Sequence, residues 1–364
     1  MSAADGDREM GTTQNPRLDL GRLNRWLAVV FMTVCLAGLL LFNLSKPRIV
    51  VVFSGDAQAV STQLMDKGMQ QVLSANRMPV TVERQYLGVR ATDASVASLR
   101  PIFVQAQQTI QMRQPSLLVL VDDGANLALG EMVSPGGTLP NGRILYVSIN
   151  GDPKDFGYTD RQRVTGLAEH LPLGAVVRML TDIGRSPGQR IGVIGLRSPT
   201  GGTAAQQVRS ESWAPHRLVA EHFVEDEAQW RDAVQAMRGQ IDVLLVVNVA
   251  TLNANQLGSA MTRKQLVDLV TWTQSQVLTI GLTASFSDLG GALSLTPSRE
   301  EQGIMAMKMA LEWLDPRREG QAPPKPAVQQ HFEVHVRQQA LQDLGVQLPR
   351  IYLEAARASG HLLP

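Results

Sequence analysis

The residues best suited to bind a small molecule follow short apolar runs in the sequence. Runs such as IVVVF at 49–53 and LLVLV at 117–121 end directly before side chains with hydroxyl, amide or carboxyl groups. Such groups bind the polar atoms of a ligand, and an aromatic ring can stack on a planar ligand. The predicted ligand-binding residues are Ser54, Asp122, Asp123, Asn150, Ser198, Thr200, Asn248, Thr283, Ser285 and Phe286.

Two adjacent carboxyl groups, Asp122 and Asp123, are the strongest charged candidates. One of them could receive the amino group of an amino-acid-like ligand. The alternative is a helix N-cap or a pair of solvated loop residues. A catalytic carboxyl pair is disfavoured because adjacent side chains usually point in different directions.

The segment SPTGGT at 198–203 joins an apolar run to an expected helix. Its amides and its hydroxyls at Ser198 and Thr200 could hold a carboxylate or a phosphate at the helix start. The alternative is a plain turn and cap. The segment lacks the Lys of a phosphate-binding P-loop and the spacing of a dinucleotide fingerprint, so a nucleotide site is not predicted.

Polar residues also follow two later apolar runs. Asn248 ends the run VLLVVN, where it could face a ligand or form a turn. Thr283 and Ser285 offer hydroxyl groups, and Phe286 offers a ring that could stack on a planar ligand. The alternative for this segment is an ordinary hinge loop with Phe286 in the core.

No catalytic or metal-binding set is predicted. His331 and His335 are four residues apart in a segment that reads as a strand, where four residues span roughly 13 Å, too far for one zinc ion. The single cysteine, Cys35, excludes an intrachain disulfide. The sequence has no zinc-protease, serine-hydrolase or kinase motif. We therefore expect no enzyme and no cofactor.

Length and composition indicate the kind of fold that must position these residues. A chain of 364 residues is long enough for two lobes, and 44% hydrophobic residues can build a sizeable core. This composition excludes intrinsic disorder for most of the chain. The net charge of +1 argues against a nucleic-acid partner, because proteins built to bind nucleic acid usually carry a basic surplus.

The segment 26–45 (WLAVVFMTVCLAGLLLFNLS) carries no charge and is mostly apolar. A helix of roughly 20 such residues crosses a bilayer. We favour an uncleaved signal anchor over a cleaved signal, because a long polar stretch precedes the segment and no small-x-small cleavage pattern follows it. A buried core helix is the third interpretation.

Basic residues near the ends of this segment indicate its orientation. Positively charged residues collect on the cytoplasmic side of a membrane span. The slight excess on the N-terminal side predicts a short cytoplasmic tail and a large periplasmic domain in a single-pass inner-membrane protein. The residues counted are Arg17, Arg22 and Arg25 before the segment, and Lys46 and Arg48 after it.

From Arg48 onward, short β-branched apolar runs alternate with longer amphipathic stretches. This alternation is typical of parallel sheets with helical crossovers, and it occurs in two sets. We therefore predict an α/β fold of two doubly wound parallel-sheet lobes joined by a multi-strand hinge and preceded by one transmembrane helix. The predicted parts are 1–25 as a disordered cytoplasmic tail, 26–45 as the anchor, 46–167 with 284–330 as lobe 1, 168–283 as lobe 2, and 331–364 as a C-terminal segment packing on the lobes.

Several short motifs occur in an order that resembles a known family. The motifs are Lys67-Gly68-Met69 with Leu73, Pro115 to Val119 followed by Gly124-Ala125, SINGDP at 148–153, Val164-Thr165-Gly166, Arg190 to Ile194, and the segment from Phe332 to Pro349. Together they resemble the substrate-binding proteins of ABC transporters with a type 1 periplasmic-binding-protein fold, in particular the tryptophan/tyrosine-binding-like branch, over residues 47–359.

The resemblance implies a membrane-anchored periplasmic solute-binding protein. Two lobes would close on a small organic, amino-acid-like ligand and present it to an ABC permease, without chemistry by this chain. The alternative is a non-transporting sensor or interaction module of an envelope membrane complex. The anchor favours this alternative, because tethering raises the effective concentration near a membrane partner.

Overall fold

The computed structural model describes residues 20–89, 96–134, 136–139, 142–160, 162–184, 188–197, 202–249 and 261–364. The chain divides into two compact units, residues 1–46 and 47–364, which are described separately. The predicted ligand-binding residues Ser198 and Thr200 lie outside the described residues.

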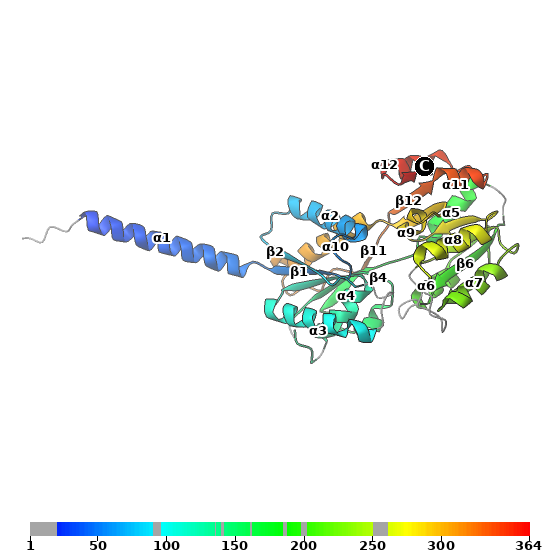
Figure 1. Ribbon diagram of the computed structural model, residues 1–364. Coiled ribbons are helices and arrows are strands. Elements are labelled where there is room, and N and C mark those ends of the chain that lie inside the picture. Colours follow the sequence, from blue (N-terminus) through cyan, green and yellow to red (C-terminus); the bar gives the residue numbers. More distant parts are fainter. Residues whose placement is uncertain are drawn as a thin grey trace, which may run out of the picture. The chain divides into compact units, whose positions relative to one another are not determined.

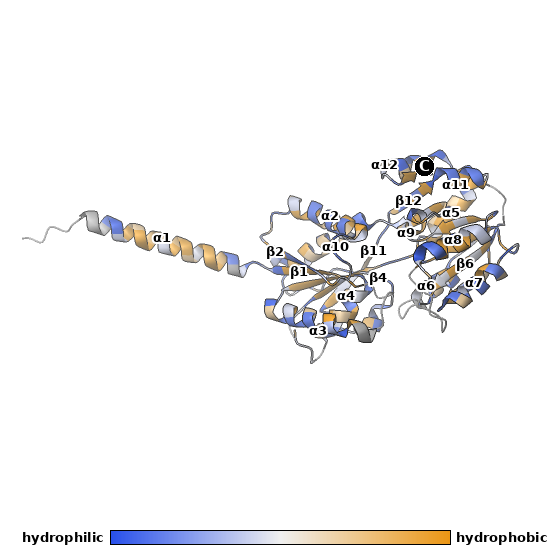
Figure 2. Ribbon diagram, viewed as in Figure 1, coloured by the Kyte–Doolittle hydropathy of each residue, from blue (hydrophilic) through white to orange (hydrophobic). Residues whose placement is uncertain are grey.

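The first unit contains one long helix, α1 (Leu20–Ser45). Its segment Asn24–Asn43 has a mean hydropathy of 2.2 and is long and apolar enough to cross a membrane. Large side chains such as Phe31 and Leu41 are exposed. Figure 2 shows that apolar residues occupy most of this helix. The length and composition therefore meet the requirement for the predicted anchor.

The first sheet of the second unit has six parallel strands (Figure 1). Alternate residues of its strand β1 face opposite sides, and both sides are apolar, as expected for a parallel sheet covered on both faces. The strand order is β11 (Ala327–Val328), β5 (Val164–Ala168), β4 (Ile144–Ile149), β3 (Leu117–Val121), β1 (Arg48–Phe53) and β2 (Thr81–Tyr86).

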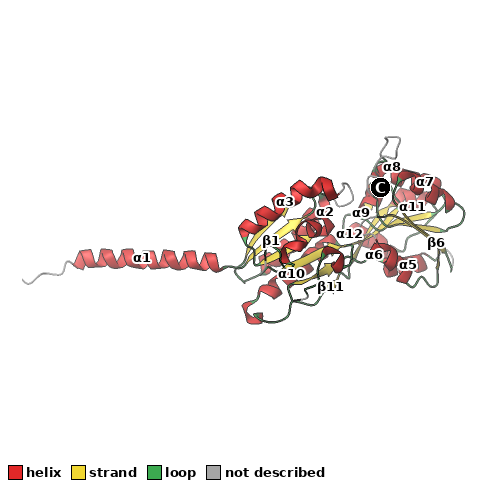
Figure 3. Ribbon diagram, turned by 90° about the horizontal axis from the view of Figure 1, so that it is seen from below, coloured by secondary structure: helices red, strands yellow, loops and turns green. Residues whose placement is uncertain are grey.

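Helices cover both faces of this first sheet (Figure 3). Ile49 and Val51 share a core with α2 (Val60–Ala75) and α10 (Arg299–Leu314). On the opposite face, Val50 and Val52 share a core with the helices that follow β2 and β3. Those helices are α3 (Val96–Arg113) and α4 (Asp122–Leu129). The second unit also contains short 3-10 helices at Gly130–Val133, Pro153–Phe156 and Pro316–Arg318.

The second sheet has seven strands, and all its pairs are parallel except β10 with β12. The strand order is β13 (Leu362–Leu363), β12 (Phe332–Arg337), β10 (Leu293–Pro297), β9 (Leu278–Gly281), β8 (Val243–Val246), β6 (Arg190–Leu196) and β7 (Arg217–Val224). One face packs on α5 (Leu173–Ile183), α6 (Gly202–Ser210), α11 (Gln338–Asp343) and α12 (Arg350–Ala358). The other face packs on α7 (Glu227–Ala236), α8 (Arg263–Thr273) and α9 (Ala284–Asp288).

Three chain crossings join the two sheets in the described part of the chain. They are residues 169–172 between β5 and α5, Ser298 between β10 and α10, and 329–331 between β11 and β12. Hydrogen bonds tie the crossings together: Gln329 Nε2 donates to the carbonyl of His170 at 2.9 Å, and Ser298 N donates to the carbonyl of His331 at 3.2 Å. The crossings therefore run side by side.

The structure confirms the α/β class with two mainly parallel sheets, and it corrects the strand assignment near the C-terminus. The sequence prediction placed 284–330 in lobe 1, but β10 pairs with β9 in the second sheet and the chain returns only at α10. The segment 331–364 contributes β12 and β13 to the second sheet rather than packing on both lobes. An apolar run alone does not specify which sheet a strand joins, because that depends on which neighbouring strands it pairs with.

Candidate functional site

The carboxyl ends of β3, β4 and β5 bring a group of polar side chains together. Ligands of open parallel sheets bind at this edge. The N-terminal turn of α10 adds one guanidinium and one amide to the same edge. We call this group the Arg299 cluster; it consists of Asp122, Asp123, Ser148, Asn150, Glu169, Arg299 and Gln302.

Arg299 is the central cation of this cluster. Its Nη1 lies 2.7 Å from Asp122 Oδ1 and 3.8 Å from Glu169 Oε2. Burial alone would lower the pKa of Arg299, but the carboxylates of Asp122 and Glu169 outweigh burial and raise it above its usual range. Arg299 therefore remains charged and holds the carboxylates of Asp122 and Glu169, which follow different strands, beside each other.

Glu169 is a largely buried carboxyl group, with 15% of its side chain exposed. Desolvation raises the pKa of Glu169, and Asp122 and Asp123 add to the rise; Arg299 and a hydrogen bond from the Gln302 side chain lower it. Its buried Oε2 and Nε2 of the fully buried Gln302 have no close hydrogen bond among the described residues. Because buried polar atoms are normally hydrogen-bonded, these two atoms can pair with each other or with a ligand or water that enters between them.

The cluster also holds its own geometry firmly. Asp123 accepts hydrogen bonds from Asn150 N at 2.9 Å and Asn150 Nδ2 at 3.1 Å, and Ser148 Oγ donates to Gln302 Oε1 at 2.7 Å. Asp122 and Ser148 have φ angles of +63° and +57°. Non-glycine residues with positive φ are strained and collect at functional sites. Two of the three non-glycine residues with positive φ in the described part of the chain thus lie at this edge, and the third is Gln114.

The remaining described candidates have mainly structural contacts. The buried Ser54 Oγ donates to Val121 O at 2.7 Å and accepts from Ala125 N at 2.7 Å, which ties β1 to β3 and α4. Asn248 Oδ1 accepts from Leu196 N at 2.7 Å, which joins the ends of β8 and β6. These bonds use the Ser54 hydroxyl proton and Asn248 Oδ1 for structure, so a ligand could engage Ser54 only as an acceptor and Asn248 through Nδ2, which lies 3.5 Å from Leu196 O.

The segment after β9 is a short helix, α9, rather than a loop. Thr283 precedes it, and its Oγ1 lies 3.2 Å from Ser285 Oγ. Phe286 is fully buried and lies against the backbones of Gly281 and Gly291, where a Cβ would clash with its ring. The structure therefore groups Asp122, Asp123 and Asn150 at one edge, and places Asn248, Thr283 and Ser285 at the strand ends of the second sheet.

Sequence reasoning missed Ser148, Glu169, Arg299 and Gln302. Glu169 follows an apolar strand directly, which is the same signal that selected Asp122. Arg299 carries no comparable signal, because its partner Asp122 is 177 residues away in sequence. Only the return of α10 to the first sheet brings these two residues together.

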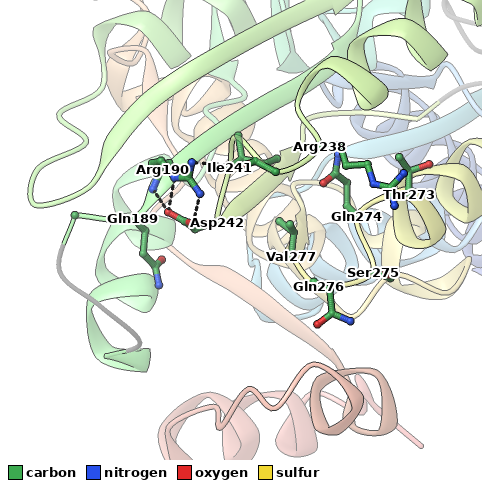
Figure 4. A pocket seen from close by; sticks show the side chains of 12 residues that line it. Gln189, Arg190, Arg238, Ile241, Asp242, Thr273, Gln274, Ser275, Gln276 and Val277 are labelled. Carbon is green, nitrogen blue, oxygen red and sulfur yellow. Dashed lines mark hydrogen bonds and ion pairs between the residues drawn. The ribbon is translucent and has the colours of Figure 1, made fainter.

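A cavity of about 550 Å³ lies at the opposite, amino-terminal edge of the second sheet (Figure 4). Arg190 forms an ion pair with Asp242 there at 2.8 Å. Buried Oε1 atoms of Gln189 and Gln274 lack hydrogen-bond partners among the described residues. The cavity begins at the amino ends of β6 and β8, whereas ligands of open parallel sheets bind at the carboxyl ends. We therefore take the Arg299 cluster as the candidate site.

The chain matches no protein-family model and no curated protein, whereas solved structures match it over most of its length. A ligand-free substrate-binding protein with adhesive properties from Clostridium difficile is 13% identical, with a TM-score of 0.61 over 83% of this chain and 96% of that one. An ABC domain in complex with L-Trp from Streptococcus pneumoniae is 16% identical, with a TM-score of 0.57 over 85% and 98%. A conserved domain protein from Vibrio cholerae is 15% identical, with a TM-score of 0.55 over 85% and 98%.

These similarities define the class of fold. The matched structures include substrate-binding proteins with the type 1 periplasmic-binding-protein fold, and residues 47–364 share that fold. At identities of 13–16% the likeness concerns the fold alone.

Proposed function

We propose that this chain is a solute-binding protein whose ligand contacts the Arg299 cluster. The observation that carries the proposal is the buried carboxylate oxygen of Glu169, which has no close hydrogen bond among the described residues and lies where the first chain crossing leaves the carboxyl end of β5. The matched substrate-binding proteins support this role, since they share the fold. The chain would act by binding and hinge motion, not by chemistry.

The charge of the cluster favours a ligand with an amino group. Among the described residues, the carboxylates of Asp122 and Glu169 share one guanidinium, that of Arg299. Such a negative surplus attracts a cation, and a partly desolvated site strengthens that attraction. Gln302 Nε2 can donate a hydrogen bond to a carbonyl or carboxylate of the same molecule. An amino-acid-like ligand meets both requirements.

The second lobe would complete the site when the lobes close. Asn248, Thr283 and Ser285 follow strands of the second sheet, at the edge where ligands bind. Ser54, Asp122, Asp123 and Asn150 would act from the first lobe. Ligand contacts made only in the closed state would favour closure, by a hinge at the three crossings.

The proposed cellular location of this function depends on α1. We propose that α1 anchors the protein in the inner membrane as a single span and that residues 47–364 lie in the periplasm, where an ABC permease is the natural partner. The tryptophan/tyrosine-binding-like branch is the family branch we favour. A non-transporting sensor or interaction module of an envelope complex is the second candidate, and it is favoured by the apolar span at Asn24–Asn43.

The proposal predicts ligand-dependent stabilisation. Full-length protein in detergent should melt at a higher temperature with one class of amino-acid-like compounds, because a ligand that binds only the native state stabilises it by mass action. Acetylation of the compound's amino group should remove most of that effect. A comparable shift with the acetylated compound would contradict the role of the carboxylates, and no shift across amino acids, amines and carboxylates would favour the interaction module.

A further inference from the structure

Two histidines far apart in sequence lie side by side in the second sheet. The imidazole rings of His335 and His361 stack with centroids 3.8 Å apart. His335 belongs to β12, and His361 directly precedes β13, which pairs in parallel with β12. Val336 N donates to the carbonyl of His361 at 2.9 Å, which fixes the backbone of His361 beside this strand.

A carboxylate lies on the same face of β12. Glu333 is two residues before His335, so both side chains point to one side of the strand, whereas Val334 and Val336 enter the core on the other. Glu333 Oε2 lies 3.4 Å from His361 Nε2 and 3.9 Å from His335 Nε2. All three ligand atoms lie within 4.8 Å of one another.

The buried histidine of this group has an imidazole nitrogen without a hydrogen bond from the described residues. The exposed fraction of His335 is 4%, and its Nε2 has no hydrogen bond from the described residues. A buried imidazole nitrogen without a partner requires an explanation.

We propose that Glu333, His335 and His361 form a site for a divalent transition-metal ion of the zinc type. Two imidazole nitrogens and one carboxylate oxygen are typical zinc ligands, and a fourth position stays open for water or another ligand. Zinc–ligand distances of about 2.0–2.1 Å require ligand atoms roughly 3.3 Å apart in a tetrahedral site. The present separations therefore need a contraction of less than about 1.5 Å.

His361 is the residue that can provide this contraction. Its side chain is 25% exposed and lies close to the C-terminus, whereas His335 is enclosed. The stacked ring planes are only 15° apart, so the ring of His361 must swing well away from that of His335 before the in-plane lone pairs of both nitrogens can point at one ion. Two further charges lie nearby: Arg337 donates to the carbonyl of Ser287, and the Asp288 carboxyl interacts with both His361 and Arg337. An ion at this site would fasten residues 361–364 to β12.

The test is the metal content and affinity of full-length, untagged protein in detergent. After chelation and dialysis against ZnCl₂, we expect one tightly bound zinc ion per chain. Glu333→Gln and His361→Ala should each weaken zinc binding at least about tenfold. His222→Ala, a histidine on β7 outside the group, should bind zinc like the wild type. Circular dichroism would verify that each variant is folded.

Cobalt provides a second measurement that does not depend on a folding-sensitive variant. Co²⁺ in a site with few ligands gives visible absorption bands, and zinc should displace it. Retention of full zinc affinity by both Glu333→Gln and His361→Ala would overturn the proposal. So would wild-type protein that retains no zinc and gives no cobalt bands.

Discussion

Glu169→Gln is expected to make the ligand-free protein more stable near neutral pH. The folded protein raises the pKa of Glu169 above its ordinary value, chiefly through burial. A group with a raised folded-state pKa contributes stability below its unfolded pKa, and that contribution is lost as pH rises through the folded pKa. At neutral pH the ionised carboxylate of Glu169 therefore destabilises the folded protein, and glutamine removes this destabilisation.

The expected gain is on the order of 1 kcal/mol at about pH 8, as for relief of an imperfectly satisfied buried polar group. The gain should shrink as pH falls and vanish below about pH 4, where the carboxyl group is protonated. Arg299 keeps its ion pair with Asp122 at 2.7 Å in the variant. Denaturant unfolding of both proteins across this pH range measures the difference. A variant that is less stable than the wild type at about pH 8 would show that the Arg299–Glu169 attraction outweighs burial.

Gly303→Ala is expected to destabilise the protein strongly. Helices α2 and α10 approach so closely that a Cβ at Gly303 would lie 2.0 Å from Met65 O, and a Cβ at Gly68 would lie 2.1 Å from Glu300 O. Both obstacles are backbone atoms, so the helices must separate. Overpacking of this kind costs about 1–3 kcal/mol. Because α10 carries Arg299, ligand affinity should fall as well.

A second glycine provides the matched control for this change. Gly174 lies in α5, and a Cβ there would meet only Glu211 Oε1, at 3.9 Å. Gly174→Ala should therefore be neutral or stabilising by up to about 1 kcal/mol, since alanine has the higher helix propensity. Thermal or denaturant unfolding compares the two variants. Equal stability of Gly303→Ala and the wild type would contradict the close helix crossing.

The sequence predicted the elements of the fold better than their assembly. The run at 49–53 is one of the apolar runs from which parallel sheets were predicted, and its residues do enter two separate cores. The segments at 122–126 and 283–286, for which a loop was one of the interpretations, begin helices instead. The run DDGAN combines turn-forming residues, and such residues also start helices, so local preference did not separate the two outcomes.

The candidate site was predictable only in part, because it is assembled by topology. Asp122, Asp123 and Asn150 were selected from their position after apolar runs, and they do lie at one sheet edge. Arg299 reaches Asp122 only through the return of α10 from the second sheet to the first. No local pattern marks a contact across that separation.

The most direct test of the account is ligand binding by three full-length proteins in detergent. Isothermal titration of an amino-acid-like ligand found by thermal shift would compare the wild type, Glu169→Gln and Glu319→Gln. Glu319 is exposed and outside the Arg299 cluster, so the same chemical change there is the control. We predict that Glu169→Gln weakens binding at least about tenfold, as expected for loss of a charge-assisted hydrogen bond, while Glu319→Gln binds like the wild type. Unchanged affinity in Glu169→Gln would show that the ligand does not contact the Arg299 cluster.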